Sequence, residues 1–298
     1  FLFLFTMTDA HTPEPTEREL ESISKAVNKL WDLDENKLIP DVHYKINLQG
    51  HKKVYQHDTD AAAESLFEFV DKDHFFKQPT YATFFQLLDN YEKTIGKEEV
   101  VTDHEIMENR QFIDQILKTK CITYLHKYLI AKGKANSDPQ VFKKQLYKIW
   151  FSLYRRGTRN DSCGFEHVFV GELKNGKVIG FHNWIQLFVE EKKGNLDYQG
   201  YICPRRRARR GHHDYYPEGD ERIISLNFKW GSESKDVSSS FIGVSPEFEI
   251  ALYTLCFLCG EEDNKIYLDD YDINIKCYRQ GNNLGTCFPE LLASHHDE

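Results

Sequence analysis

The sequence predicts an α+β protein, in which a helical N-terminal lobe, residues 12–157, packs on a C-terminal lobe of antiparallel β-sheets, residues 158–294. Apolar residues up to about residue 155 recur at intervals of three and four, the period of an amphipathic helix. Beyond that point they alternate with period two, which is typical of half-buried strands. Helices that precede strands, rather than alternating with them, favour antiparallel sheets joined by hairpins.

Length and composition narrow the class of protein. The chain has 298 residues, and 38 Lys and Arg against 47 Asp and Glu give a formal charge of −9. A chain this long buries roughly three quarters of its unfolded surface, which excludes a disordered tail, a fibrous protein and a disulfide-stapled miniprotein. No apolar run approaches the roughly 20 residues that span a bilayer, so we expect no membrane partner. The apolar start, FLFLF, is too short for a signal-peptide core and is left out of the predicted fold.

The helical lobe begins with Thr16-x-x-Glu19, a capping box that satisfies the first backbone N–H groups of a helix. Its apolar face follows at Leu20, Ile23, Val27, Leu30 and Trp31. Further helices are expected at about 60–76, 80–92, 103–131 and, after Asp138-Pro139, through Leu153. Asp32-x-Asp34-x-Asn36 resembles the start of a calcium loop but lacks its later glycine and glutamate, so we interpret it as a helix end.

Cysteine usage favours an intracellular protein. The seven cysteines are an odd number without framework spacing, which is typical of reduced thiols. Cys256-x-x-Cys259 lies inside the apolar run IALYTLCFLCG, so we interpret both as small core residues rather than as a redox or metal site.

The β-rich lobe is predicted from alternation. Two strands are expected at Phe165–Leu173 and Lys177–Glu190, and later ones at about 222–230, 237–243, 265–268 and 272–279, with one helix opened by Ser245-Pro246-Glu247. Asn175-Gly176 between the first two strands is a strong signal for a type I′ hairpin. In that register, facing residue numbers sum to 351.

The hairpin register predicts a pair of histidines. His167 and His182 become diagonal neighbours on one face, with backbones about 7–8 Å apart, and Glu166 and Glu172 fall on the opposite face. Imidazoles titrate near neutrality, so one can accept a proton while the other donates one. Two ordinary sheet histidines, satisfied by hydrogen bonds, are the alternative. A zinc pair is a third interpretation, although both carboxylates lie on the wrong face for it.

Arg205 and Arg206 begin a run of five arginines within six residues. Bounded by Pro204 and Gly211, they predict a loop with a strong positive field that suits phosphate contact. Flanking tyrosines offer stacking faces for bases. A solvated loop or a localisation signal is the alternative. Lys235, in a turn-rich segment, would by itself be interpreted as a solvated side chain.

Several segments resemble the EndoU family, the XendoU-like poly(U)-specific endoribonucleases. They are GFEHVFVGE, GFHNW, the lysine and serine before FIGVSPEFE, ALYTLCFL and GTCFP, and the resemblance covers about residues 12–290. It implies cleavage of single-stranded RNA at uridines to 2′,3′-cyclic phosphate ends, with dependence on or stimulation by Mn²⁺ or Ca²⁺. No metal ligands are predicted. Nothing indicates a symmetric interface, so we expect a monomer.

The resemblance also implies residue roles. It makes His182 the general base, His167 the general acid and Lys235 the group that stabilises the anionic phosphorane. It implies further contacts to substrate at Ser239 and Thr286, and it implies carboxylates needed for full activity at Glu166 and Glu172. Phe288 stands where the family usually has tyrosine, which keeps a stacking face for uracil but loses the phenol.

Two other classes of function remain open from the residues alone. A metal-dependent phosphodiester hydrolase would leave linear phosphate ends. A non-catalytic protein that binds U-rich RNA would give no product.

Overall fold

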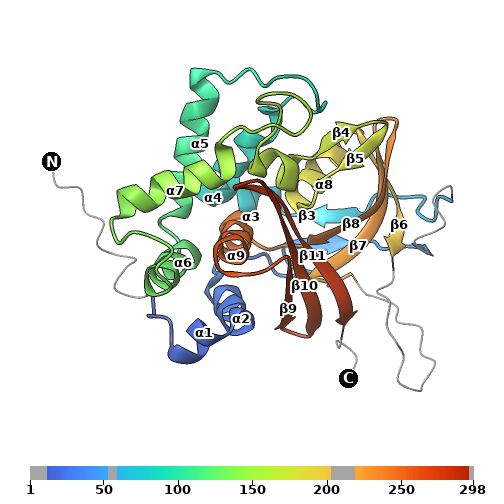
Figure 1. Cartoon of the computed structure of the whole chain (residues 1–298). Helices are drawn as coiled ribbons and strands as arrows, with labels where there is room; N and C mark the ends of the chain where they lie inside the picture. The colour runs from blue at the N-terminus through green and yellow to red at the C-terminus, as the bar shows by residue number, and fades with distance from the viewer. Residues whose placement is uncertain (1–11, 53–58, 203–218, 295–298) are drawn as a thin grey trace.

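The α+β class is confirmed by a computed structural model, which describes residues 12–52, 59–202 and 219–294 (Figure 1). Helices dominate the first half of the chain and strands the second half, although each half contains both. Within the described ranges, no helix is long and apolar enough to cross a membrane.

The first half contains seven α-helices within the described residues, with three short strands. The helices are α1 (Glu17–Glu21), α2 (Ile23–Leu33), α3 (Lys72–Phe76), α4 (Pro79–Gln86), α5 (Asp103–Ile116), α6 (Lys120–Ala131) and α7 (Pro139–Phe151), and a 3₁₀ turn, η2, covers Leu87–Asp89. The capping box at Thr16 is confirmed, but Ser22 ends α1 and caps α2, so the first predicted helix is divided. Asp34 ends α2, as expected.

The strands of the first half were not predicted. They are β1 (Tyr44–Ile46), β2 (His51–Lys52) and β3 (Phe67–Val70). The predicted helix over 60–76 is wrong for most of its length, because β3 pairs with β1 there and only α3 is helical. β2 pairs in parallel with a strand about 150 residues further on, a partner that local periodicity cannot indicate.

The second half contains two sheets. Its elements are a π-helical turn, η3 (Glu166–Val170), the strands β4 (Glu172–Lys174), β5 (Lys177–Ile179), β6 (Leu196–Ile202), β7 (Ile223–Trp230), β8 (Glu233–Phe241), β9 (Asp263–Leu268), β10 (Tyr271–Gln280) and β11 (Asn283–Ser294), and the helices α8 (Trp184–Lys192) and α9 (Pro246–Cys259). Six strands form one sheet in the order β2-β6-β7-β8-β5-β4, and three form another in the order β11-β10-β9. Hairpin-joined strands are antiparallel as predicted, whereas β2–β6 and β5–β8 are parallel.

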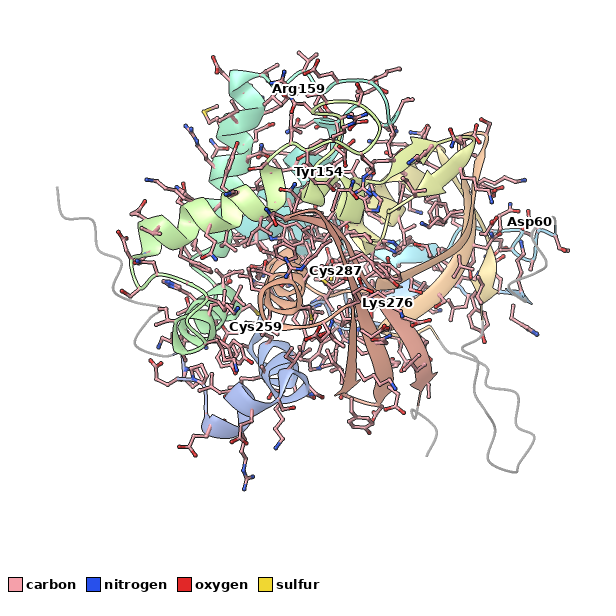
Figure 2. All side chains as sticks on the ribbon, in the orientation of Figure 1. Asp60, Tyr154, Arg159, Cys259, Lys276 and Cys287 are labelled. Atoms are coloured by element: carbon pink, nitrogen blue, oxygen red, sulfur yellow. The ribbon has the colours of Figure 1, made fainter. Side chains whose placement is uncertain are left out.

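α9 joins the two halves. Ser245 caps it and Pro246 occupies its first turn, as the sequence predicts. Figure 1 shows α9 between the helices and the strands β9–β11, and it packs against α2, α6 and β10. Cys256 is buried and free in this helix, whereas Cys259 is half-buried. Cys287 on β11 faces Cys277 on β10 and is another buried thiol. Figure 2 labels Cys287 near the centre of the molecule.

Candidate active site

A type I′ hairpin is present where the sequence predicts it. Asn175 and Gly176 both have positive φ, 51° and 75°, as this turn requires. Glu172 faces Ile179 and Lys174 faces Lys177, so the facing numbers sum to 351. The hairpin nevertheless ends at Glu172 and Ile179.

The prediction that His167 lies on a strand is wrong. His167 lies in the π-helical turn η3, and all five residues of that turn are buried. Because even Glu166 and His167 are buried in this turn, no exposed face marks its period, which explains the error. Gly171, with φ of 92°, ends the turn and leads into β4.

His182 is not on a strand either. Asn183 ends the extended segment and caps α8, because its side-chain oxygen accepts hydrogen bonds from the N–H groups of Ile185 (3.0 Å) and Gln186 (3.1 Å). The second predicted strand is therefore confirmed only at β5, and α8 covers its last part. An asparagine followed by an apolar run is a start signal that could have indicated this helix.

The structure still brings the two histidine segments together. The N–H of Phe181 donates to the carbonyl of His167 (3.1 Å), and the N–H of His182 donates to the carbonyl of Val168 (2.8 Å). Gly180, with φ of 64°, permits this approach, because a Cβ there would lie 1.8 Å from the carbonyl oxygen of His167. Phe181 also has a positive φ, 64°, which is strained for a bulky residue.

Three contacts define the surroundings of His182, one of them between its Nδ1 and the hydroxyl of Ser238 (3.3 Å). Its Nδ1 donates to the backbone carbonyl of Ser239 (3.1 Å), and its ring stacks on Phe288 with centroids 4.4 Å apart. A carbonyl only accepts, so Nδ1 carries the proton and the neutral ring presents an unprotonated Nε2. Burial, followed by the charges of Lys235 and His167, lowers the pKa of His182 well below its usual value.

His167 has a different partner. Its Nδ1 is hydrogen-bonded to the carboxylate of Glu172, which is fully buried. The prediction that Glu172 lies on the opposite face is therefore wrong, because the helical turn breaks the alternation on which it rested. Burial lowers the pKa of His167, and the Glu172 carboxylate opposes that shift. Of the two rings, His167 is consequently the easier to protonate.

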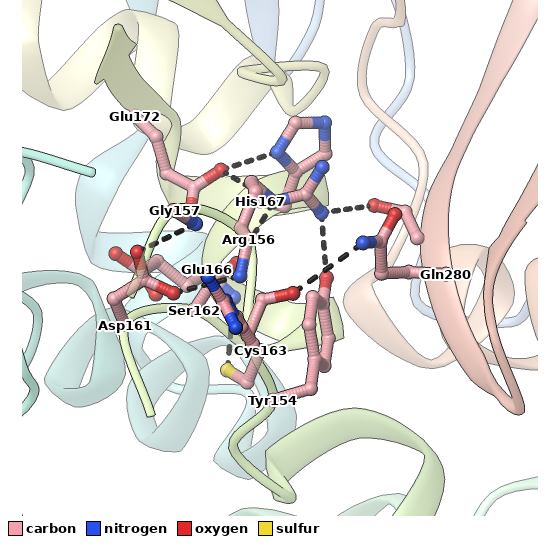
Figure 3. A network of polar contacts seen from close by, with 12 residues as sticks. Tyr154, Arg156, Gly157, Asp161, Ser162, Cys163, Glu166, His167, Glu172 and Gln280 are labelled. Atoms are coloured by element: carbon pink, nitrogen blue, oxygen red, sulfur yellow. Dashed lines mark hydrogen bonds and ion pairs between the residues drawn. The ribbon is translucent and has the colours of Figure 1, made fainter. Parts of the chain in front are cut away.

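Arg156 holds the carboxylate of Glu172 in place (Figure 3). Its Nε lies 3.3 Å from Glu172 Oε2, and its Nη2 donates to the carbonyl of Gly285 (2.5 Å) and to Tyr154 Oη (2.6 Å). Asp161 shapes the turn by accepting from the backbone N–H of Arg156 (2.8 Å). Sequence reasoning missed this arginine, because its partners lie on three separate segments.

Lys235 lies on β8 and is half-buried rather than freely solvated. Burial lowers its pKa to about 8, with the charge of Asp236 acting in the opposite direction. Its ammonium group lowers the pKa values of His167 and His182, which places it within electrostatic reach of both rings.

The expected substrate-contacting residues border this pair of histidines. The hydroxyl of Ser239 lies 2.8 Å from that of Ser225 on β7. Thr286 Oγ1 on β11 has no hydrogen-bond partner among the described residues. It is separated by one residue from Phe288, which stacks on His182. Arg205 and Arg206 lie outside the described residues.

Glu166 is chemically unlike Glu172. It is fully buried, and burial together with the charges of Glu172 and Glu99 raises its pKa to about 10. It is therefore protonated at neutral pH, and its neutral carboxyl cannot act as a charged partner for a cation or for an imidazolium.

The described residues do not provide an evident metal centre. Residues 12–52, 59–202 and 219–294 contain no group of three or more His, Cys, Asp or Glu that could hold an ion. The two histidines use their Nδ1 atoms for a carbonyl and a carboxylate, an arrangement that zinc-binding histidines also have, so these contacts alone do not separate the zinc interpretation from acid–base chemistry.

Comparison with known proteins shows that the chain has the fold of an endoribonuclease. The family model described as "Endoribonuclease XendoU" matches residues 22–289, and the chain belongs to that family. The resemblance drawn from its motifs is thereby confirmed.

Individual relatives agree with this assignment. The chain is 44% identical over 286 residues to poly(U)-specific endoribonuclease-A of Xenopus laevis, with 93% of this chain and 96% of the relative covered. It is 39% identical to a uridylate-specific endoribonuclease of Homo sapiens, with 88% of this chain and 61% of the relative covered. A solved structure of XendoU, described as a splicing independent snoRNA processing endoribonuclease, matches with a TM-score of 0.80 and 44% identity, covering 94% and 99% of the two chains.

Proposed function

We propose that the protein cleaves single-stranded RNA at uridines and leaves 2′,3′-cyclic phosphate ends. The observation that carries this proposal is the contrast between the two imidazoles. The neutral ring of His182 presents an unprotonated Nε2, whereas the Nδ1 of His167 is hydrogen-bonded to the Glu172 carboxylate. That combination supplies a base and an acid for one displacement at phosphorus.

His182 is the general base in this mechanism. Nε2 removes the proton from the ribose 2′-OH, and the 2′ oxygen forms a bond to the adjacent phosphorus. The Nδ1 hydrogen bond to the carbonyl of Ser239 fixes the ring orientation, and stacking on Phe288 restrains the ring plane.

His167 is the general acid. Its Nε2 gives a proton to the departing 5′ oxygen as the bond between that oxygen and phosphorus breaks. The Glu172 carboxylate favours the imidazolium form and orients the ring through Nδ1, as an aspartate does in hydrolase triads.

Lys235 stabilises the charge that develops on the non-bridging phosphoryl oxygens. An ammonium group in a partly dry site is worth several kcal/mol at this step. Its pKa of about 8 leaves it mostly protonated at neutral pH. The role also requires that activity declines as the pH rises through about 8.

Uracil is expected to contact Ser239, Thr286 and Phe288. The unpartnered hydroxyl of Thr286 can bond to a pyrimidine edge, and Phe288 offers its ring for stacking. The names of the relatives, poly(U)-specific and uridylate-specific endoribonuclease, support this preference. Arg205 and Arg206 are proposed to hold RNA phosphates.

The metal requirement is a separate part of the proposal. Family membership supports dependence on, or stimulation by, Mn²⁺ or Ca²⁺. Because none of the steps above uses a metal, the cation is proposed to act away from the histidines. Full cleavage rate in an excess of chelator would contradict this part.

The test is incubation of a uridine-containing oligoribonucleotide with and without metal. The wild type is compared with His167→Ala, His182→Ala and Lys235→Ala. We expect cyclic-phosphate ends from the wild type and a rate about 10²- to 10⁴-fold lower in each variant. Linear phosphate ends would instead identify a metal-dependent hydrolase, and binding without product would identify an RNA-binding protein.

A further inference from the structure

The strand that carries Lys235 is irregular at a defined point. Along β7 and β8, Leu226 faces Ser238 and Phe228 faces Lys235. One residue of β7, Asn227, therefore faces two residues of β8, which is a β-bulge between Lys235 and Ser239. Bulges change the direction of side chains on a strand, so the shape of this bulge determines where the Lys235 ammonium lies relative to Ser239.

Asn227 satisfies the backbone of this bulge. Its Nδ2 donates to the carbonyl of Lys235 (2.8 Å) and to the carbonyl of Asp236 (3.2 Å). The side chain of Asn227 is 3% exposed, so these bonds form in a nearly dry environment where an unmade bond is costly.

Lys52 determines which way the Asn227 amide points. Its Nζ donates to Asn227 Oδ1 (2.7 Å), and the lysine is itself buried. An ammonium group can only donate, so the amide oxygen must face Lys52 and the amide NH₂ must face the two carbonyls. Lys52 comes from β2, which the first half of the chain adds to the edge of the six-stranded sheet.

We propose that Lys52 and Asn227 are positioning residues for Lys235. The ammonium group of Lys52 orients the side-chain amide of Asn227, and this amide holds the bulge that determines the direction of the Lys235 side chain. This inference rests on the proposed role of Lys235. It gives the first half of the chain a specific part in the reaction, through the hydrogen bond from Lys52 to Asn227.

The most informative variant is Asn227→Asp. A carboxylate keeps the pair with Lys52 but cannot donate to the carbonyls of Lys235 and Asp236. We expect kcat on a uridine dinucleotide to fall about 10-fold or more, with KM within about twofold, because a displacement of about 1 Å can cost that much. We expect the melting temperature to fall by several degrees, because two buried carbonyls lose their donor, so kcat is expressed per folded protein. Lys52→Met, which frees the amide to rotate, should have a similar effect on kcat.

The control is Lys229→Met, which removes an exposed lysine two residues beyond Asn227 on the same strand. Its kcat should equal that of the wild type. The pH profile gives a second readout. The charged groups that act on Lys235 or respond to it are Asp236, His167 and His182. If Lys235 turns toward solvent in Asn227→Asp, its pKa rises, and its contribution to the alkaline decline of kcat/KM moves to higher pH.

The outcomes separate this inference from the proposed function. Wild-type kcat in Asn227→Asp, or a loss matched by loss of folded protein, would overturn the positioning role. Lys235→Met, measured in parallel, tests the role on which the inference rests. Full activity in Lys235→Met would overturn the proposed function itself, whereas an inactive Lys235→Met beside a fully active Asn227→Asp would overturn only the inference.

Discussion

The surroundings of the two histidines differ in charge, although the backbone segments that carry them are hydrogen-bonded to each other. His182 meets a neutral backbone carbonyl and an aromatic ring, whereas His167 meets a buried carboxylate held by an arginine. Burial lowers both pKa values, but only His167 has a carboxylate that opposes the shift. Two identical imidazoles can therefore act as base and acid because the groups bonded to their Nδ1 atoms differ.

Glu172→Gln should reduce the difference in protonation between the two histidines more than any other change. Without the carboxylate, the pKa of His167 falls further, so less of the ring is protonated at neutral pH. We expect kcat/KM to fall about 10²-fold at pH 7, and its decline with rising pH to begin at lower pH than in the wild type. A pH–rate profile on a uridine dinucleotide measures both effects. An unchanged profile would contradict the pairing of Glu172 with an acid.

Arg156→Gln should weaken the same side of the site by a smaller amount. It removes the ion pair to Glu172 and the hydrogen bond to Gly285, which lies next to Thr286. We expect kcat/KM to fall about 10-fold, together with weaker discrimination between uridine and cytidine. Arg159→Gln is the matched control, because Arg159 is exposed on the same turn and lies at the outer edge of the molecule (Figure 2). Equal losses in both variants would argue for general charge effects.

Thr286→Val tests base recognition rather than proton transfer. The variant keeps the shape but removes the hydroxyl that lacks a partner among the described residues. One hydrogen bond of about 1 kcal/mol predicts a roughly fivefold lower preference for uridine over cytidine, measured as the ratio of kcat/KM values. The pH profile should not change. A preserved preference would remove Thr286 from the proposed uracil contacts.

Glu166→Gln should have the smallest effect on activity, because a protonated carboxyl and an amide are both neutral. We expect less than a 10-fold loss. Stability should respond instead. The folded-state pKa of Glu166 is about 10, above the usual 4.5. Between these pH values the unfolded state releases a proton that the folded state retains. The side chain therefore destabilises the folded state increasingly as the pH rises above 4.5. Thermal unfolding at pH 8 should show Glu166→Gln about 3 °C more stable; a lower melting temperature would contradict a protonated Glu166.

Local signals predicted local structure well. The capping box at Thr16, the Asn175-Gly176 turn and the cap at Ser245 all lie where the sequence places them, because each depends on neighbouring residues alone. The alternation around His167 was misleading, since a fully buried run has no exposed face. The partners that distinguish the two imidazoles, by contrast, could not be predicted from neighbouring residues.

These partners come from distant segments. Ser239 lies 57 residues from His182, and Gly285 lies 129 residues from Arg156. Lys52 lies 175 residues from Asn227. Contacts of this type depend on how the sheets pack, and no short motif records them. The identity of the two histidines could therefore be proposed from motifs, but their separate electrostatic surroundings required the structure.

The most direct test of the account changes the leaving group of the substrate. Uridine 3′-(p-nitrophenyl phosphate) releases a stable phenolate that needs no general acid, whereas a uridine dinucleotide releases a basic alkoxide. His167→Ala should lose activity on the dinucleotide but recover most of it on the phenyl ester, and His182→Ala should be impaired on both. Recovery of His182→Ala instead, with His167→Ala impaired on both substrates, would contradict the assignment of base and acid.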